Sequence, residues 1–164
     1  MKISVAITSC VTAIALCAAA PAIGGDIKSE ILQGRVTVTD GDTLRMGPFR
    51  IRLFGIDAPE QQQTCRTTQT WHCGIAAKDA LIELIRDEPV RCDVQDIDRY
   101  DRAVAICHVR DLELNAELVR AGMAVATPQY SRRYMSLQDE ARRGKRGLWA
   151  SKFQMPEEYR RDRR

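Results

Sequence analysis

Residues 35–56 read RVTVTDGDTLRMGPFRIRLFGI, and their alternation of apolar and polar side chains decides the fold. The alternation predicts strands at 35–39, 43–46 and 49–56, because successive side chains of a strand point to opposite faces of a sheet. Asp-Gly-Asp follows the first strand and Gly-Pro the second, and both are typical turn sequences. The segment therefore predicts a three-stranded meander.

After the meander the period of the apolar residues changes from two to three or four. This spacing predicts an amphipathic helix over 74–88, which ends ahead of a proline. Two further strands are expected at 90–95 and 103–109, and two helices at 114–121 and 131–143, each closed by a glycine. The order β-β-β-α-β-β-α-α predicts an α+β fold of the OB type, a five-stranded β-barrel that commonly binds nucleic acids or sugars.

The charge of the chain is unevenly distributed. Its 164 residues suffice for one compact domain, and its formal net charge is only +3. Residues 132–164 nevertheless carry eleven Lys or Arg against five Asp or Glu, whereas residues 23–131 carry thirteen against seventeen. A basic end on a mildly acidic body can attract polyanions; a solvated helix face with a frayed tail is the alternative. We expect a barrel domain at 31–150 and a basic C-terminal tail at 151–164.

The N-terminus has the pattern of a signal peptide at residues 1–22. Met1-Lys2 gives a positive start, residues 3–20 are apolar or small without a charge, and Ala-x-Ala spacings close the stretch. An uncleaved membrane anchor is the alternative, but the small residues at the end of the stretch favour cleavage. We expect an exported protein, periplasmic or extracellular, with no stable membrane association after cleavage.

Four cysteines follow the expected cleavage site: Cys65, Cys73, Cys92 and Cys107. An even number of cysteines in an oxidising compartment indicates two disulfides, in one of three pairings. A structural zinc site is the alternative, but neither spacing is the Cys-x2-Cys of a zinc ribbon or finger. The residues alone leave the pairing open.

Three polar stretches carry candidate chemistry. They are Asp-Gly-Asp-Thr at 40–43, Arg-Leu-Phe-Gly-Ile-Asp-Ala-Pro-Glu at 52–60 and Asp-Arg-Tyr-Asp-Arg at 98–102. Hydrolysis of a phosphodiester requires neutralisation of the phosphate charge and a nucleophilic water, and a hard cation with carboxylate ligands assists both. The residue types in these stretches suit that reaction.

Each kind of side chain has a place in such a site. Asp42 and Asp57 are suitable ligands for calcium if the first and third strands bring them together. Arg52 and Arg102 can hold phosphate oxygens and stabilise the charge of the transition state. Glu60 can orient or deprotonate the water. Taken singly, the same residues also suit a hairpin turn, a loop exit and solvated arginines.

In this order and at this spacing, the three stretches together resemble the staphylococcal nuclease (thermonuclease) family. The family pattern is Asp-Gly-Asp-Thr, then Arg-Leu-x-x-(Ile/Val)-Asp-x-Pro-Glu, then Asp-x-Tyr-Gly-Arg. The stretches Asn-Ala-Glu-Leu-Val-Arg-Ala-Gly at 115–122 and Gly-Leu-Trp at 147–149 are also similar to it. The resemblance covers residues 34–149, and it implies that the domain at 31–150 is a nuclease with an OB-type barrel.

The resemblance also implies a Ca²⁺ site and a set of catalytic side chains. The expected Ca²⁺ ligands are Asp42, Asp57 and the backbone carbonyl of Ala58. The expected catalytic residues are Arg52, Arg102 and Glu60, the last as general base or water-orienting carboxylate. The family cleaves DNA and RNA on the 5′ side of the phosphate and leaves 3′-phosphate ends. A monomer is the default, and the alternative function is a non-catalytic OB-fold module that binds nucleic acid; the presence of all five candidate side chains favours catalysis.

The chain departs from the family pattern at three places. Ala58 replaces a threonine, which matters little if only its carbonyl is a ligand. Asp101 replaces a glycine; Asp tolerates the left-handed backbone conformation, but its charge is expected to weaken phosphate binding by the neighbouring arginine. A tyrosine of the family's nucleotide pocket is missing, so Tyr130 or Tyr100 is the candidate to stack on a base, unless both are packing residues. Arg99 is counted with them as a substrate-binding residue.

In a fold of this family the cysteines fall into two pairs. Cys65 and Cys73 bracket a polar loop that follows the candidate base. Cys92 and Cys107 lie on the last two strands, where they can face each other across a hairpin. The expected disulfides are therefore Cys65–Cys73 and Cys92–Cys107.

Overall fold

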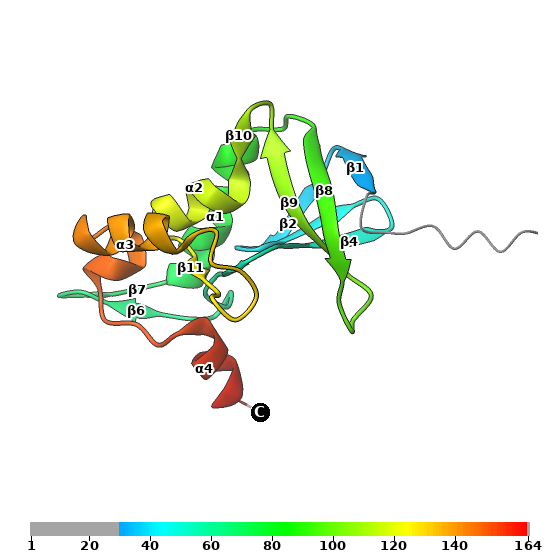
Figure 1. Cartoon of the computed structure of the whole chain (residues 1–164). Helices are drawn as coiled ribbons and strands as arrows, with labels where there is room; N and C mark the ends of the chain where they lie inside the picture. The colour runs from blue at the N-terminus through cyan, green and yellow to red at the C-terminus, as the bar shows by residue number, and fades with distance from the viewer. Residues whose placement is uncertain (1–29, 164) are drawn as a thin grey trace, which may run out of the picture.

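The computed structural model describes residues 30–163, which form a strongly curled β-sheet with helices gathered at one end (Figure 1). The main sheet has seven strands in the order β1-β8-β9-β4-β3-β2, with β10 paired to β9. Its members are β1 (Ile31–Gly34), β2 (Thr37–Asp40), β3 (Thr43–Met46), β4 (Phe49–Leu53), β8 (Val90–Ile97), β9 (Ala103–Val109) and β10 (Leu112–Glu113). The signal peptide expected at 1–22 lies outside the described residues.

The sheet curls into a barrel because two consecutive strands, β1 and β2, form its two opposite edges. β1 pairs antiparallel with β8 and β2 pairs antiparallel with β3, at opposite ends of the strand order. Only residues 35–36 separate β1 from β2, so the two edges must lie close together. Register shifts between Val38 and Asp40 and between Val94 and Asp96 add the local bend that a bulge gives a strand. The predicted α+β fold of OB type is confirmed.

Four α-helices and one 3-10 turn complete the part of the chain that the structure describes. They are α1 (Cys73–Ile85), α2 (Leu114–Arg120), α3 (Met135–Arg143), η2 (Gly147–Ala150) and α4 (Pro156–Arg161). The first two agree with the sequence prediction. α3 begins at Met135 rather than at Ser131, because the Ser131 hydroxyl accepts the N–H of Arg133 and the chain turns to bury Tyr134. Within this part of the chain, no helix combines the length and the apolar character needed to span a membrane.

Two small sheets lie outside the barrel. One pairs β5 (Ile56–Asp57) with β11 (Val125–Ala126), and the other pairs β6 (Cys65–Arg66) with β7 (Thr70–Trp71). The expected strand at 49–56 is therefore interrupted: it leaves the main sheet after Leu53, where Gly55 adopts a φ of +73°. The observed order contains these additional short strands, and the break directs β5 away from the barrel.

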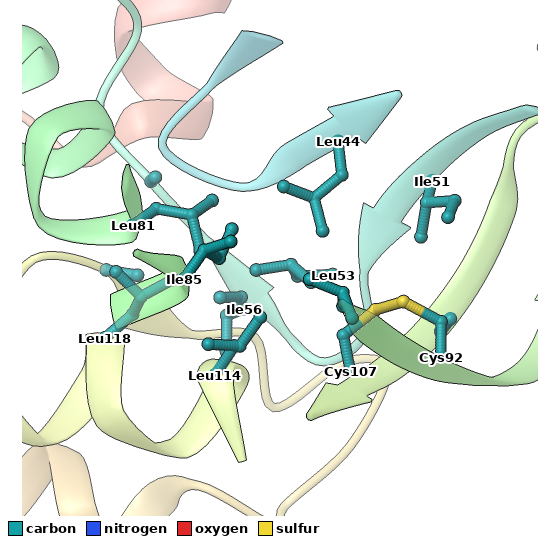
Figure 2. Packing of buried hydrophobic residues seen from close by; sticks show 14 of the residues in the cluster. Leu44, Ile51, Leu53, Ile56, Leu81, Ile85, Cys92, Cys107, Leu114 and Leu118 are labelled. Atoms are coloured by element: carbon teal, nitrogen blue, oxygen red, sulfur yellow. A yellow bond between two sulfur atoms is a disulfide. The ribbon is translucent and has the colours of Figure 1, made fainter. Parts of the chain in front are cut away.

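The core lies between the curled sheet, α1 and α2 (Figure 2). Its buried side chains include Leu44, Ile51 and Leu53 from the sheet, Leu81 and Ile85 from α1, and Leu114 and Leu118 from α2. Full burial of a side chain of this size stabilises the fold by about 1.5–3 kcal/mol. These contacts fix α1 and α2 against the strands that carry the conspicuous polar stretches.

The segment after η2 packs against the domain. The main chain of Lys152 forms two hydrogen bonds with that of Arg66, of 2.8 and 2.9 Å. The side chain of Gln63 donates to the carbonyl of Gln154 at 2.7 Å. The segment then forms α4, which lies at the C-terminal end of the molecule, beyond the β6–β7 hairpin (Figure 1). Residues 151–163 of the expected basic tail thus pack against the domain.

Both disulfides occur in the expected pairing. Cys65–Cys73 joins β6 to the first residue of α1. Cys92–Cys107 joins directly opposed residues of β8 and β9, whose Cα atoms lie 4.0 Å apart (Figure 2). The second disulfide is part of the barrel core, so it ties together two neighbouring inner strands of the sheet.

Replacement of both Cys92 and Cys107 by alanine should lower the free energy of unfolding by about 3 kcal/mol, since the disulfide closes a loop with a sequence separation of 15 residues. Urea unfolding of the oxidised variant and the oxidised wild type measures this difference. A loss below about 1 kcal/mol would contradict the assigned contribution.

Candidate active site

Asp42 is held at the turn between β2 and β3. Its carbonyl accepts the N–H of Leu53 in β4 at 2.9 Å. Gly41 is required by a close approach, because a Cβ at this position would lie 2.7 Å from the Cβ of Ala58 and 2.8 Å from that of Ala77 in α1. The turn is therefore clamped between the sheet and α1, and Asp42 is only 4% exposed.

Asp57 is positioned by the small sheet that β5 forms with β11. Asp57 lies opposite Val125 in this sheet. The break that directs β5 away from the barrel is held by the buried amide of Asn115, which donates to the carbonyls of Phe54 at 3.0 Å and Ala105 at 3.2 Å. As a result Asp57 is only 3% exposed. Its carboxylate and that of Asp42 share one hydrogen-bond partner, Arg52.

Arg52 joins the two buried carboxylates. Its Nη1 lies 2.9 Å from Oδ1 of Asp42, and its Nη2 lies 2.7 Å from Oδ1 of Asp57. Oδ2 of Asp42 accepts the N–H of Ala58 at 2.9 Å, and the Thr43 hydroxyl donates to Oδ1 at 3.0 Å. The fold thus brings together four of the residues that the sequence assigned to one site: Asp42, Arg52, Asp57 and Ala58.

Burial dominates the electrostatics of this group. It raises the pKa of Asp42 to about 7, although the guanidinium of Arg52 opposes the rise. Burial also acts to lower the pKa of Arg52, but Asp42 and Asp57 outweigh it and raise that pKa, so Arg52 stays charged. A carboxyl whose charged form is this poorly solvated gains from an additional cation nearby.

Glu60 lies on a turn whose main chain is held by Gln63 and by α1. The buried amide oxygen of Gln63 accepts the N–H of Glu60 at 3.2 Å, and the N–H of Gln63 donates to the carbonyl of Glu60 at 2.7 Å. α1 approaches so closely that a Cβ on Gly74 would overlap the same carbonyl oxygen. The main chain of the turn is therefore held in place, whereas the side chain of Glu60 is 41% exposed and reaches solvent.

Arg160 of α4 enters the same group of charges. Its Nη1 donates to Oδ1 of Asp57 at 2.9 Å and to Oε1 of Glu60 at 2.8 Å. Its Nη2 donates to Oδ2 of Asp57 at 2.8 Å. Arg160 thereby links Asp57 to Glu60, and the five charged side chains Asp42, Arg52, Asp57, Glu60 and Arg160 form one connected cluster, the carboxylate–arginine cluster.

The third polar stretch lies on the loop between β8 and β9. Asp98 accepts the N–H of Tyr100 at 2.9 Å and forms an ion pair with Arg102 at 2.7 Å. The guanidinium groups of Arg99 and Arg102 lie 5.0 and 5.5 Å from the centre of the Tyr100 ring. Asp101 has a φ of 58°, so it adopts the left-handed conformation that glycine at this position in the family pattern would take. In the described structure Arg102 is thus paired with Asp98 and not with the buried carboxylates.

The structure nevertheless places Arg102 next to the strand of Arg52. β9 runs parallel to β4, with Ala103 opposite Ile51 and Val104 opposite Arg52. Arg102 immediately precedes β9, two residues before Val104, so its position in the chain is on the same side of the sheet as Arg52. Tyr130, on the loop between β11 and α3, is 75% exposed and free to contact a ligand from solvent.

Four residues that position or contact the site residues cannot be recognised as such from the sequence. They are Gln63, Gly74, Asn115 and Arg160. Asn115 was noted only within the stretch at 115–122, and Arg160 only as part of the basic C-terminal charge. No local pattern distinguishes the buried Gln63 from the exposed glutamines that precede it, because its burial depends on contacts with Glu60 and Gln154, which are distant from each other in sequence.

The oxygen ligands of the cluster suit a hard cation. Within residues 30–163, no group of three or more His, Cys, Asp or Glu side chains converges as a ready metal site. Asp42 and Asp57 provide two buried carboxylates, and calcium commonly completes such a set with backbone carbonyls and waters. The buried carboxyl of Asp42, with its raised pKa, and the guanidinium of Arg160 on both oxygens of Asp57 show that this position favours positive charge. The residues present therefore fit calcium.

Comparison with known families agrees with this geometry. A family model described as staphylococcal nuclease homologue matches residues 50–151. The match includes the stretches at 52–60 and 98–102, and it begins after the turn that carries Asp42. The chain belongs to the staphylococcal nuclease family.

Individual relatives are similar to the chain over most of its length. An uncharacterized endonuclease of Escherichia coli O157:H7 is 35% identical over 133 residues, which are 76% of this chain and 82% of the relative. An uncharacterized endonuclease of Haemophilus influenzae is 34% identical over 122 residues, covering 70% of this chain and 64% of the relative. The succinoglycan biosynthesis protein ExoI of Rhizobium meliloti is 33% identical over 128 residues, covering 74% of this chain and 66% of the relative. The chain thus spans just under two thirds of the length of the last two proteins.

Gly74→Ala should destabilise the protein by about 1–3 kcal/mol, because the added methyl group forces the Glu60 turn away from α1. Gly34→Ala is the matched control, since a Cβ there would make an ordinary contact of 3.5 Å with the Met46 side chain. Urea unfolding compares the two variants with the wild type. Equal stability of the two variants would show that the approach of α1 does not hold the turn.

Proposed function

We propose that this protein is a calcium-dependent nuclease that hydrolyses phosphodiester bonds of DNA and RNA and leaves 3′-phosphate ends. The observation that carries the proposal is the bridge that Arg52 forms between the buried carboxylates of Asp42 and Asp57, with Glu60 linked to the same cluster. Membership of the staphylococcal nuclease family and the endonuclease names of several relatives support the reaction class.

The phosphate is bound by cationic groups of the cluster. Asp42, Asp57 and the carbonyl of Ala58 are the residues that would hold calcium, which would supply positive charge to polarise the phosphate. Arg52 presents a rigid, always charged guanidinium at the same place, which is the arrangement that stabilises charge developing on phosphate oxygens. Arg102, once released from Asp98, provides a second guanidinium from the neighbouring strand.

Glu60 is the candidate general base. Its carboxylate is exposed to solvent while its main chain is fixed by Gln63 and α1, so it can accept a proton from a water without moving the turn. The water oxygen forms a bond to phosphorus, the bond between phosphorus and the 5′ oxygen breaks, and the phosphate stays on the 3′ oxygen. The 5′ oxygen takes up a proton as it leaves.

The β8–β9 loop is the candidate contact for the nucleic-acid bases and backbone. Tyr100 is half exposed, and the guanidinium groups of Arg99 and Arg102 both lie close to its ring. Aromatic and guanidinium planes of this kind stack on bases without strong sequence preference. Tyr130 offers a second exposed aromatic ring. This combination suits single-stranded nucleic acid better than a small, buried ligand.

A role as a non-catalytic binding module is the second candidate. One observation favours it: Arg160 occupies Asp57 and Glu60, two of the groups that hydrolysis requires. In that case the chain binds nucleic acid without cleaving it, and the substitution of Glu60 leaves this binding unchanged. We favour the enzyme because Asp42, Asp57, Arg52, Glu60 and Arg102 are all retained.

We also propose that the protein acts outside the cytoplasm. Two disulfides of this kind persist in oxidising compartments and are rare in the reducing cytosol. The apolar N-terminal stretch expected to be a signal peptide agrees with export. The domain is expected to act as a monomer.

Glu60→Gln should lower the rate of DNA cleavage about a hundredfold or more, because the amide cannot accept the proton of the water. Calcium-containing digests of single-stranded DNA measure the rate. Glu83→Gln removes an exposed carboxylate from α1 and is the control, with an unchanged rate expected. Full activity of Glu60→Gln would remove Glu60 from the mechanism.

Calcium binding should weaken about tenfold between pH 8 and pH 6, because burial raises the pKa of Asp42 to about 7 and the cation must then displace a proton. In the absence of metal, the native state holds this proton to a higher pH than the unfolded chain, so the same group lowers stability as the pH rises from about 4 to 7. Calorimetric titrations at several pH values measure the affinity. Asp79→Asn, on an exposed carboxylate, should keep the dependence; an affinity that does not change with pH would contradict this role of Asp42.

A further inference from the structure

The segment that carries Arg160 is anchored to the site at three points. Lys152 bonds the main chain of Arg66 in β6. Gln154 accepts a hydrogen bond from Gln63, the residue that fixes the Glu60 turn. Arg160 then reaches Asp57 and Glu60. The position of α4 over the carboxylates is therefore specified by contacts along the whole segment.

Arg160 occupies the groups that the cation needs. Asp57 uses both of its oxygens to bind this guanidinium, and Oδ1 also binds Arg52. A divalent cation bound to the same carboxylate would lie within a few ångströms of the guanidinium, in a place where burial weakens solvent screening. The two positive charges repel each other, so Arg160 and the cation compete for Asp57.

The contact of Arg160 with the two carboxylates can also be released. Pro156 is the buried residue of α4, and the side chain of Arg160 is 34% exposed. Most of the helix therefore lies on the surface, and its withdrawal uncovers little apolar area. Burial acts to lower the pKa of Arg160, but the hydrogen bonds that it donates to Asp57 and Glu60 outweigh burial and raise that pKa, so Arg160 stays positively charged over the whole physiological range.

We propose that α4 is an autoinhibitory segment in which Arg160 takes the place of the cation in the free protein. This inference rests on the proposed function. Calcium binds tightly only after Arg160 has left Asp57 and Glu60. A polyanionic nucleic acid offers the guanidinium phosphate oxygens in exchange for the two carboxylates, so substrate and calcium favour each other's binding.

Calcium titration of the mature chain by calorimetry tests the proposal. Arg160→Gln should bind calcium at least tenfold more tightly than the wild type, because the competing charge is gone. Arg161→Gln is the matched control, since it removes the same charge from the adjacent exposed position of α4, and its affinity should equal that of the wild type. Arg160→Lys keeps a charge but loses the two-pronged contact, and its affinity should fall between those of the wild type and Arg160→Gln.

Hydrogen exchange supplies a readout that needs neither a variant nor activity. Addition of calcium to the wild type should speed the exchange of backbone amides in residues 157–161, while those of α1 stay unchanged. Equal or weaker calcium binding by Arg160→Gln, or slower exchange of α4 with calcium, would overturn the autoinhibitory role and leave the proposed nuclease intact. An absence of calcium binding in the wild type and in every variant would overturn both proposals.

Discussion

The candidate site depends on one guanidinium that lies between two buried carboxylates. Asp42 and Asp57 are both almost completely removed from solvent, and two such charges repel each other in a medium of low polarity. Arg52 meets both at hydrogen-bonding distance, which offsets the repulsion and fixes the separation of the two acids. Loss of one partner from a buried ion pair commonly costs about 3–5 kcal/mol, so this arrangement persists only because all three residues are present.

The irregular parts of the fold serve this arrangement. The break after Leu53 takes Asp57 out of the main sheet, and the buried amide of Asn115 holds that break. The close approach of Gly41 to α1 holds the turn that carries Asp42. A third irregular element, the turn of Glu60, is held by Gln63 and α1. The barrel supplies a rigid frame. The places where the chain departs from regular strand geometry determine the positions of the polar side chains.

Much of the frame could be predicted from the sequence, because it follows from local periodicity. The alternation in residues 35–56 gave the meander, and the helical spacing after Gly74 gave α1. The end of the third strand could not be predicted, since the chain leaves the sheet at Phe54, whose carbonyl accepts a hydrogen bond from Asn115, about sixty positions further along the chain. Short-range patterns contain no information about such contacts.

The same reasoning applies to the site. Asp42, Arg52, Asp57 and Ala58 were expected together, and the structure brings them together; Arg102 was expected with them, and it is paired with Asp98 instead. The sequence showed the basic charge of the C-terminal segment but gave no sign that Arg160 would bind Asp57 and Glu60. That contact joins residues about one hundred positions apart, and it depends on how α4 docks rather than on any motif.

The proposed function is tested most directly by digestion of single-stranded DNA with the purified protein, in calcium and then in excess chelator, followed by analysis of the ends. We expect cleavage that requires calcium and yields 3′-phosphate and 5′-hydroxyl ends. Cleavage that persists in chelator, or products with 5′-phosphate ends, would contradict the roles given to Asp42, Asp57 and Glu60. Binding of DNA without any cleavage would contradict the enzyme and favour the binding module.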